Sequence, residues 1–311
     1  MRIIFLGTAG SLPTPQRNPI AVAVQMGPDI LLFDCGEGTQ RQFMLSSASF
    51  MRVTDIFISH FHGDHFLGLP GLIQSMNFFG RKRELRIFGP AGIKEALDLA
   101  LSLSFFQPSF DVSAFELVHN QCIHFSGYDV KAIQADHTIP AFSYVLEEEP
   151  RPGKFNVKKA RDLGVPEGPA FRALQEGKTV SVGDLTISPS MVIGPKRRGR
   201  KISISGDTRP NLKFIEASKN ADLMIHEATL SSDLEDEANE YGHSTAQQAG
   251  KVAAQAKAKM LYLYHFSNRY DDVKSLVNEA KKEFPIVFAA EDLLSLQINP
   301  PEEEWNRSVF N

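Results

Sequence analysis

The sequence predicts an α/β (α+β) protein in which two β-sheets pack face to face and helices cover their outer surfaces. Two observations lead to this prediction. Short apolar strands alternate with helices along the chain, and this alternation occurs in two successive halves that each contain turns with metal-binding side chains. Elements in such an order bury their apolar faces in layered sheets with helices outside.

Composition and charge describe an ordinary globular protein of 311 residues, enough for one large domain or two smaller ones. Hydrophobic residues make up 42% of the chain, which supplies a core, and the net charge of −4 gives no global sign of a polyanionic partner. Nucleic-acid binding would therefore depend on local basic patches. The only cysteines, Cys35 and Cys122, lie far apart, which argues against a disulfide framework and fits a reducing compartment.

The beginning of the chain does not have the pattern of a targeting signal. Its apolar run, residues 2–6, is shorter than the core of a signal peptide. No stretch approaches the ~18 consecutive apolar residues that would span a bilayer. We therefore expect a cytoplasmic protein that has no membrane partner.

The first part of the chain alternates strands with glycine-rich turns. The expected strands cover residues 2–6, 20–25, 30–33, 53–59 and 84–88. Apolar residues at helical spacing predict three helices. These helices cover residues 38–47, 69–79 and 93–103.

A second strand-rich stretch covers residues 112–146, after which the composition changes. Residues 150–180 contain four prolines, four glycines and seven Lys or Arg, and we interpret them as an inserted, protruding arm on a single domain of residues 1–311. Regular alternation then resumes. The expected strands cover residues 201–207, 223–227, 261–264 and 286–289, and the expected helices cover residues 244–260 and 271–284.

The strongest local signal is the turn His60-Phe61-His62-Gly63-Asp64-His65, directly after an apolar strand. In a tight turn, His60 and His62 can point one way while Asp64 and His65 point the other, so that one segment supplies two ions. Imidazole nitrogens and carboxylate oxygens suit Zn²⁺. The alternative is a polar loop with histidines grouped by chance. With nine histidines in the whole chain, such a group favours the metal site.

Three further polar residues, His137, Asp207 and His265, each stand at the end of an apolar strand before a turn. Singly, each would more often be an ordinary core or rim residue. Together they supply what the first turn lacks, because a zinc ion needs about four ligands including a solvent molecule. The complete predicted ligand set is His60, His62, Asp64, His65, His137, Asp207 and His265, with Asp207 as a bridge.

Other potential ligands lie outside this pattern. His119 and His124 flank Cys122 without a matching strand end, and we interpret them as ordinary polar residues. Cys35 follows a strand, but the ligand set is complete without it, so we expect a small buried side chain.

These residues resemble the signature of the metallo-β-lactamase superfamily, an HxHxDH turn with later His, Asp and His ligands. Within it, the chain resembles the ribonuclease Z family, endonucleases that mature the 3′ ends of tRNA, over nearly its whole length. Further motifs that carry this resemblance are Phe5-Leu6-Gly7-Thr8, Phe33-Asp34-Cys35-Gly36-Glu37-Gly38-Thr39-Gln40, Ser205-Gly206-Asp207-Thr208, His226-Glu227-Ala228-Thr229, His243-Ser244-Thr245 and His265-Phe266-Ser267-Asn268-Arg269-Tyr270.

The resemblance implies a four-layer αββα sandwich with two Zn²⁺ ions per subunit, other divalent ions being the alternative. It implies that His60, His62, His137 and Asp207 hold one ion, and that Asp64, His65, Asp207 and His265 hold the other. It further implies precursor tRNA as the substrate, and a homodimer in which the arm of one subunit serves the site of the other.

We expect two ions ~3.5–4 Å apart to hold a bridging hydroxide that attacks the scissile phosphodiester. Asp64 would orient this nucleophile as the proton acceptor that the family implies. His243, fixed by Glu227, would protonate the leaving O3′. The expected products are a tRNA 3′-hydroxyl and a 5′-phosphate on the trailer. The alternative role of Glu227 is to support a zinc-ligating histidine.

Several residues near the last ligand and in the first loop are candidates for contact with the substrate. Ser267 and Arg269 are placed to reach a phosphate, and an internal ion pair is the alternative for Arg269. Thr8, Arg17 and Asn18 are expected to border the cleft.

The arm carries a local excess of positive charge. Residues 151–178 contain seven Lys or Arg against three Asp or Glu. A solvated surface is the usual role of such a stretch, but its contrast with an acidic protein favours binding to the RNA backbone. The resemblance implies that the arm grips tRNA away from the cut. The arm residues that we expect to bind are Lys154, Lys158, Lys159 and Arg161. A second basic cluster, residues 196–201, precedes the strand that leads to Asp207.

Two other functions compete with this hypothesis. A small-molecule metallo-hydrolase on the same scaffold, a phosphodiesterase or thioesterase, would share the metal turn but has no use for a basic arm. An RNA-binding protein without catalytic activity is the second alternative, and the complete ligand set argues against it.

Overall fold

A computed structural model describes residues 1–103 and 106–301 of the chain. The described residues separate into two compact units. The first comprises residues 1–147 and 200–299, and the second comprises residues 148–199 with the described residues after 299.

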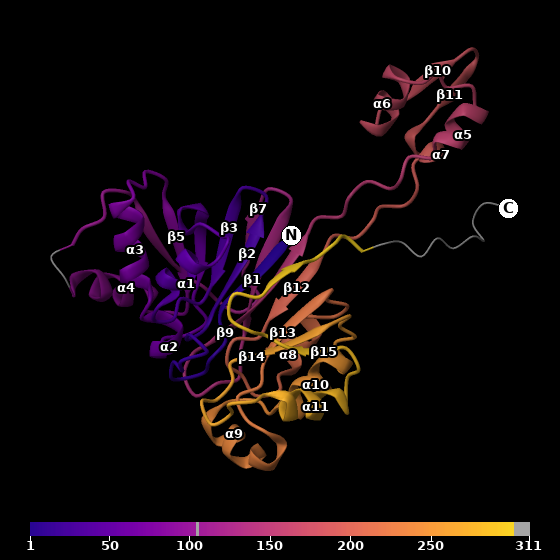
Figure 1. The fold of residues 1–311 in the computed structure, drawn as a ribbon. Coiled ribbons are helices and arrows are strands. Elements are labelled where there is room, and N and C mark those ends of the chain that lie inside the picture. The colour runs from indigo at the N-terminus through magenta and orange to yellow at the C-terminus, as the bar shows by residue number, and fades with distance from the viewer. Residues whose placement is uncertain (104–105, 302–311) are drawn as a thin grey trace. The chain divides into compact units, whose positions relative to one another are not determined.

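The first unit contains two seven-stranded sheets (Figure 1). The first sheet has the order β16-β1-β2-β3-β4-β5-β6, antiparallel from β16 to β3 and parallel from β3 to β6. Its strands are β1 (Arg2–Gly7), β2 (Ala21–Met26), β3 (Asp29–Phe33), β4 (Val53–Phe57), β5 (Leu85–Gly89), β6 (Val112–Glu116) and β16 (Ser295–Gln297).

The second sheet has the order β15-β14-β13-β12-β9-β8-β7. Strands β12 to β15 are parallel, whereas β9 is antiparallel to β12 and β7 is antiparallel to β8. Its strands are β7 (Cys122–Phe125), β8 (Tyr128–Gln134), β9 (Phe142–Glu148), β12 (Lys201–Ile204), β13 (Leu223–Glu227), β14 (Leu261–Tyr264) and β15 (Val287–Ala289).

Helices pack on the outer face of each sheet, as Figure 1 shows for α3 and α4 on the first and for α10 and α11 on the second. The helices that follow strands of the first sheet are α1 (Thr39–Leu45), α2 (Gly63–Phe66), α3 (Leu69–Phe78) and α4 (Ile93–Ser102). Those of the second half are α8 (Leu212–Ala217), α9 (Glu235–Tyr241), α10 (Ala246–Gln255) and α11 (Lys274–Lys281). Short 3-10 turns cover Phe50–Arg52 and Ser232–Leu234.

Successive residues of β1 face two different cores, because side chains alternate across a strand. Ile4 and Leu6 belong to a core shared with α1, α3 and α4. Ile3 and Phe5 belong to a core between the two sheets, where they meet residues such as Tyr144 of β9. A third core lies between the second sheet and α8, α10 and α11. Three cores between four layers confirm the αββα sandwich predicted from the sequence.

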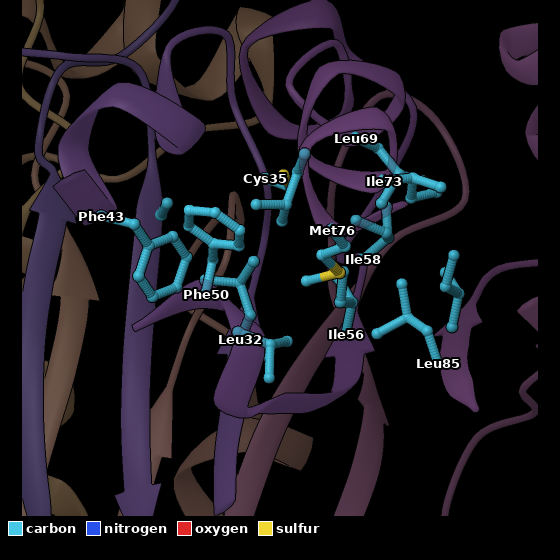
Figure 2. Packing of buried hydrophobic residues seen from close by; sticks show 14 of the residues in the cluster. Leu32, Cys35, Phe43, Phe50, Ile56, Ile58, Leu69, Ile73, Met76 and Leu85 are labelled. Atoms are coloured by element: carbon cyan, nitrogen blue, oxygen red, sulfur yellow. The ribbon is translucent and has the colours of Figure 1, made fainter. Parts of the chain in front are cut away.

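Figure 2 shows part of the first of these cores. Phe43 of α1 and Met76 of α3 pack over Leu32 of β3 and Ile56 of β4. Cys35 is fully buried in the same core, as expected for a small apolar residue rather than a metal ligand.

The predicted elements all have counterparts, but the helices expected over residues 244–260 and 271–284 are both shorter than expected, the second of them being α11 (Lys274–Lys281). The helix expected over residues 244–260 is α10, which begins after Thr245 in a capping box with Gln248. It ends at Gln255, and Lys257 then adopts a positive φ of 51°. The helices α8 and α9 were not predicted, because each contains only six or seven residues.

The second unit has a small core of its own. It contains α5 (Val157–Asp162), α6 (Pro169–Gln175), α7 (Pro189–Val192), β10 (Val180–Val182) and β11 (Leu185–Ile187). The buried side chains are Ala160, Val165, Leu174, Ile187 and Val192. Its helices are one or two turns long, its strands have three residues each, and no element buries more than one residue, so no apolar period is visible in the sequence. The unit continues to residue 199, well beyond the residues 150–180 interpreted as an arm.

Among the described residues, no helix is both long enough and apolar enough to cross a membrane.

The close packing of α10 on α11 leads to a prediction about stability. A Cβ atom at Gly250 would lie 2.5 Å from the carbonyl oxygen of Ala280, whereas a Cβ at Gly71 of α3 would meet only the flexible end of Gln40 at 3.2 Å. Both Gly→Ala changes add about 1 kcal/mol of helix propensity. We expect Gly250→Ala to be less stable than Gly71→Ala by about 1–3 kcal/mol, the usual cost of overpacking.

Urea unfolding followed by circular dichroism measures this difference. Because the gain in helix propensity is common to both variants, the difference isolates the overlap with Ala280. Equal stability of the two variants would show that α11 can move aside without cost.

Candidate metal centre

The seven predicted ligands all follow the ends of strands at one edge of the sandwich. The turn from His60 to His65 follows β4 of the first sheet. His137, Asp207 and His265 follow β8, β12 and β14 of the second sheet. Strands that run in the same direction present their carboxyl ends at the same edge, so the fold brings together residues up to 205 positions apart.

These side chains form two adjoining groups. His60, His62, His137 and Asp207 make one group, and Asp64, His65 and His265 make the other, with ligand atoms within 4.8 Å of one another in each group. Asp207 connects them. Its Oδ2 lies 3.6 Å from Nε2 of His60 and 3.3 Å from Nε2 of His65, and its Oδ1 lies 3.2 Å from Nε2 of His265.

The donor atoms fit divalent cations. Ring nitrogens of His60 and His62 lie 3.0 Å apart, and those of His65 and His265 lie 3.2 Å apart, so their lone pairs converge. The Oδ1 atom of Asp207 is buried and accepts no hydrogen bond from the described residues. Burial lowers the pKa of His60, and the neighbouring His65 lowers it further, which keeps the imidazole neutral as a ligand must be. The group therefore forms a site for divalent metal.

The second nitrogen of four histidines is held by a partner outside the ligand set. Such contacts fix the tautomer and the orientation of a ligand. The pairs are His60 Nδ1 with Ser59 Oγ at 2.9 Å, His65 Nδ1 with Asp34 Oδ2 at 2.8 Å, His137 Nδ1 with the Gly242 carbonyl at 2.8 Å, and His265 Nδ1 with Thr229 Oγ1 at 2.9 Å.

Asp34, which holds His65, is not among the site residues predicted from the sequence. It lies one residue past β3 with a φ of 59°, and its carboxylate also accepts hydrogen bonds from the backbone N–H and the hydroxyl of Ser59. A carboxylate at the end of an apolar strand was the signal that identified Asp207. Asp34 has the same sequence context, since it directly follows the apolar residues 30–33.

The first loop closes over the second group of ligands. The backbone N–H of Ser11 donates to Oδ2 of Asp64 at 2.6 Å, and Ser11 has a φ of 62°. A Cβ at Gly10 would lie 2.7 Å from the ring of His265, so this position requires glycine. Burial raises the pKa of Asp64, but the neighbouring His65 and His265 outweigh it and hold the pKa well below its usual value.

His243 and Glu227 form the predicted pair beside the ligands. Nδ1 of His243 lies 3.1 Å from Oε1 of Glu227, and the His243 ring stacks on His265 with centroids 5.5 Å apart. Glu227 is fully buried and accepts two more hydrogen bonds, from Thr208 N at 2.8 Å and Thr229 Oγ1 at 2.6 Å. Burial lowers the pKa of His243, but the charges of Glu227 and Asp207 outweigh it and raise the pKa to about 9.

Arg269, one of the predicted phosphate-binding residues, forms an internal ion pair. Both of its terminal nitrogens contact the carboxylate of Glu237. This contact is the alternative considered from the sequence. The hydroxyl of Ser267 is half-buried and lies 3.4 Å from the backbone nitrogen of Arg269.

The three predicted residues of the first loop are joined to Asp292. Thr8 is fully buried, and its hydroxyl donates to Asp292 and accepts from Arg17 at 2.8 Å. The backbone N–H of Asn18 donates to the same carboxylate at 2.7 Å. These contacts brace the loop that covers Asp64, so their direct role is structural, and contact with a substrate stays a prediction.

The four predicted arm residues belong to the second unit and are exposed. Lys158, Lys159 and Arg161 lie on α5, and Lys154 precedes it. Arg161 pairs with Glu167 at 2.6 Å.

Comparisons with known proteins agree on one family. The chain is 46% identical to ribonuclease Z of Methanosarcina acetivorans over 96% of this chain and 98% of that protein, and 43% identical to ribonuclease Z of Archaeoglobus fulgidus over 96% and 97%. Among solved structures it is similar to human tRNase Z, short form, with 30% identity, a TM-score of 0.70, and coverage of 97% of this chain and 100% of that one.

Two further comparisons are weaker. A metallo-β-lactamase fold protein from Bacillus subtilis has a TM-score of 0.69 over 95% of this chain at 18% identity, which shows the fold alone. A family profile described as anti-Pycsar protein Apyc1 matches residues 1–149, less than half of the chain.

The contact between Asp34 and His65 leads to a prediction about metal affinity. Asp34→Asn keeps the shape of the side chain and removes no ligand, but it removes the charge that orients His65. We expect zinc affinity to fall about 10–100-fold, the usual effect of losing such a partner. Competition with a chromogenic chelator measures the affinity.

Asp29→Asn is the matched control, because Asp29 begins β3, the strand after which Asp34 lies, and pairs with Arg83 at 2.6 Å. We expect this variant to bind zinc as tightly as the unmodified protein. If the Asp34 and Asp29 variants bound zinc with equal affinity, Asp34 would have no role in metal binding.

Proposed function

The chain belongs to the ribonuclease Z family of the metallo-β-lactamase superfamily, and from this membership we propose that it is the endoribonuclease that removes the 3′ trailer from precursor tRNA. The observation that carries the proposal is the convergence of seven His and Asp side chains at one edge of a sandwich that matches ribonuclease Z relatives over nearly their whole length. The cytoplasmic location expected from the sequence is part of this proposal.

We propose two zinc ions per subunit. His60, His62 and His137 would hold one, Asp64, His65 and His265 would hold the other, and Asp207 would be shared between them. When bound, the ions supply an acidified water and offset negative charge on the phosphodiester. The predominance of imidazole among the ligands supports zinc over Mg²⁺ and Ca²⁺, which prefer oxygen ligands.

We assign the proton transfers to Asp64 and His243, and the positioning of His243 to Glu227. Asp64 is fixed by the Ser11 N–H, and its carboxylate faces the ligands, where it can accept a proton from the attacking water. His243 is partly exposed and held by Glu227, which keeps it protonated at neutral pH. It is therefore suited to donate a proton to the leaving O3′, which yields a tRNA 3′-hydroxyl and a trailer 5′-phosphate.

The role of His243 can be separated from metal binding by the choice of leaving group. A ribose O3′ needs a proton to leave, whereas nitrophenolate leaves without one. We expect His243→Ala to slow cleavage of precursor tRNA by about 10²–10⁴-fold, the usual contribution of a general acid. Hydrolysis of bis(p-nitrophenyl) phosphate should change little, and the metal content should stay the same.

Glu227→Gln serves as the second variant, because it removes the charge and keeps the hydrogen bond. It should give a smaller loss on the same tRNA substrate. An equal loss on both substrates in His243→Ala would assign His243 to positioning of the ligands rather than to proton donation.

The second unit is proposed to bind the RNA backbone. Lys154, Lys158 and Lys159 are exposed, and the unit is basic within an acidic chain. Phosphate contacts of this kind release counterions on binding. The support for this proposal is charge and exposure together with the length over which the ribonuclease Z relatives match.

The homodimer is also a proposal. The first unit exposes a group of large apolar side chains on α1 and α3 that a second copy could cover. These are Met44, Leu45, Phe78 and Phe79, which are 67%, 53%, 88% and 61% exposed. Apolar patches of this kind commonly mark protein interfaces.

The salt dependence of tRNA binding tests the second unit. We expect the double change Lys158→Ala and Lys159→Ala to weaken tRNA binding and to lower the slope of log affinity against log salt by about 1 for each phosphate that the variant no longer neutralises. Turnover of bis(p-nitrophenyl) phosphate should not change, since that substrate has no RNA backbone for the second unit to bind.

The double change Lys281→Ala and Lys282→Ala is the control, because these two exposed lysines are also adjacent and lie at the end of α11 in the first unit. It should leave the slope as it is. Identical slopes for the two double variants would show that Lys158 and Lys159 of α5 do not neutralise RNA phosphates.

A further inference from the structure

A second group of metal-binding side chains lies on the hairpin formed by β7 and β8. The side chains of Cys122, His124 and Asp129 each offer one ligand atom, and these atoms lie within 4.8 Å of one another. The ligands of the metal centre follow the carboxyl ends of strands, whereas Asp129 lies at the beginning of β8. Along that strand it is roughly 17 Å from the end that leads to His137. The two groups are therefore separate.

The register of the hairpin places all three side chains on one face. His124 pairs directly with Asp129, and Cys122 lies two residues before His124, so their side chains point to the same side. The alternate residues Ile123, Phe125 and Tyr128 point to the other side and pack against the core between the two sheets.

The opposite face of the hairpin is held firmly. The rings of Phe125 and Tyr128 stack with centroids 4.8 Å apart, and the strands are joined by a two-residue turn in which Gly127 has a φ of 87°. A site built on a strand pair fixed in this way keeps its geometry better than one on a loop.

Contacts within the group already bring the donors together. Nδ1 of His124 lies 2.8 Å from Oδ1 of Asp129, and the thiol of Cys122 lies within 4.8 Å of the ligand atoms of both residues. The side chain of His124 is 76% exposed and that of Asp129 is 41% exposed, so an ion can enter from solvent. As an ion pair alone, a contact this exposed contributes little to stability.

We propose that Cys122, His124 and Asp129 form a second, peripheral site for a thiophilic divalent cation, with zinc as the ion that fits best. Thiolate, imidazole and carboxylate are all zinc ligands, with bonds of about 2.0–2.3 Å. Tetrahedral geometry at these lengths places ligand atoms about 3.3–3.8 Å apart, so the three donors need only small side-chain rotations. Binding releases the thiol proton to solvent, and water completes the fourth position.

This site revises the interpretation of His124 as an ordinary polar residue. The sequence separates His124 from Asp129 by a turn and shows no strand end beside them. Only the pairing of β7 with β8 brings the three donors together. His119 stays outside the group, since its ring contacts Asn120 and the backbone nitrogen of Gln134.

Cobalt substitution tests the proposal on the full-length protein. Co²⁺ bound to a thiolate gives a charge-transfer band in the near ultraviolet, and the metal centre contains no sulfur ligand. The other cysteine, Cys35, is fully buried in a core. We therefore expect the band in the unmodified protein and its complete loss in Cys122→Ser, while the visible absorption of cobalt at the metal centre remains.

Variants of the other two donors distinguish a three-residue site from a reactive thiol. His124→Ala and Asp129→Asn should each weaken cobalt binding, followed by the charge-transfer band, by at least about tenfold, because even loss of an orienting partner costs about 10–100-fold. His119→Ala is the matched control on the same surface and should leave the affinity unchanged.

Two results would overturn the proposal. One is the absence of a thiolate band in the unmodified protein loaded with excess Co²⁺. The other is a band whose affinity is the same in His124→Ala and Asp129→Asn as in the unmodified protein, which would indicate a thiol binding cobalt without partners. Neither result bears on cleavage of precursor tRNA, so the two proposals fail independently.

Discussion

The buried carboxylate of Asp207 is the charge around which the metal centre is organised. It is 2% exposed and lies between ring nitrogens of His60, His65 and His265. A buried carboxylate costs several kcal/mol unless opposite charge compensates it. Protonated His243, whose Nδ1 lies 3.8 Å from Oδ2 of Asp207, offsets part of this charge, and divalent cations among the neutral imidazoles would offset more of it. The backbone of the preceding residue, Gly206, positions this carboxylate. Gly206 has a φ of 57°, and its N–H donates to the hydroxyl of Tyr264.

The sandwich explains how one edge collects ligands from distant segments while an insertion leaves the site intact. Strands β9 and β12 pair directly, with Lys201 opposite Glu147, although the second unit separates them in sequence. Two neighbouring antiparallel strands are connected at one end only, and the entropic cost of closing that connection rises slowly with its length. The insertion follows the last residue of β9, whereas the turn containing His137 precedes the first residue of that strand. A unit of this size can be inserted there without moving a ligand.

The grouping of the seven side chains could be predicted from the sequence because four of them lie in one hexapeptide and the others follow apolar strands. The partners of those ligands could not be predicted in the same way. Gly242 holds His137 through a backbone carbonyl, which any residue supplies. Thr229 reaches His265 only because β13 and β14 are neighbours.

The core of the second unit could not be predicted from the sequence either, since each of its short elements buries too few residues to show a period.

The internal contacts of two arginines bear on where affinity for a polyanion arises. Arg17 bonds the Thr8 hydroxyl and the Ala290 carbonyl, and Arg269 is paired with Glu237. The positive charges that the sequence places beside the metal centre are thus already engaged within the first unit. Under the proposed function, attraction for the scissile phosphate would then come mainly from bound cations and from His243, groups that act on a single phosphodiester. Affinity for a long RNA backbone needs charges elsewhere, and the exposed lysines of α5 are a separate source. Chemistry and substrate retention are consequently expected to respond to different substitutions.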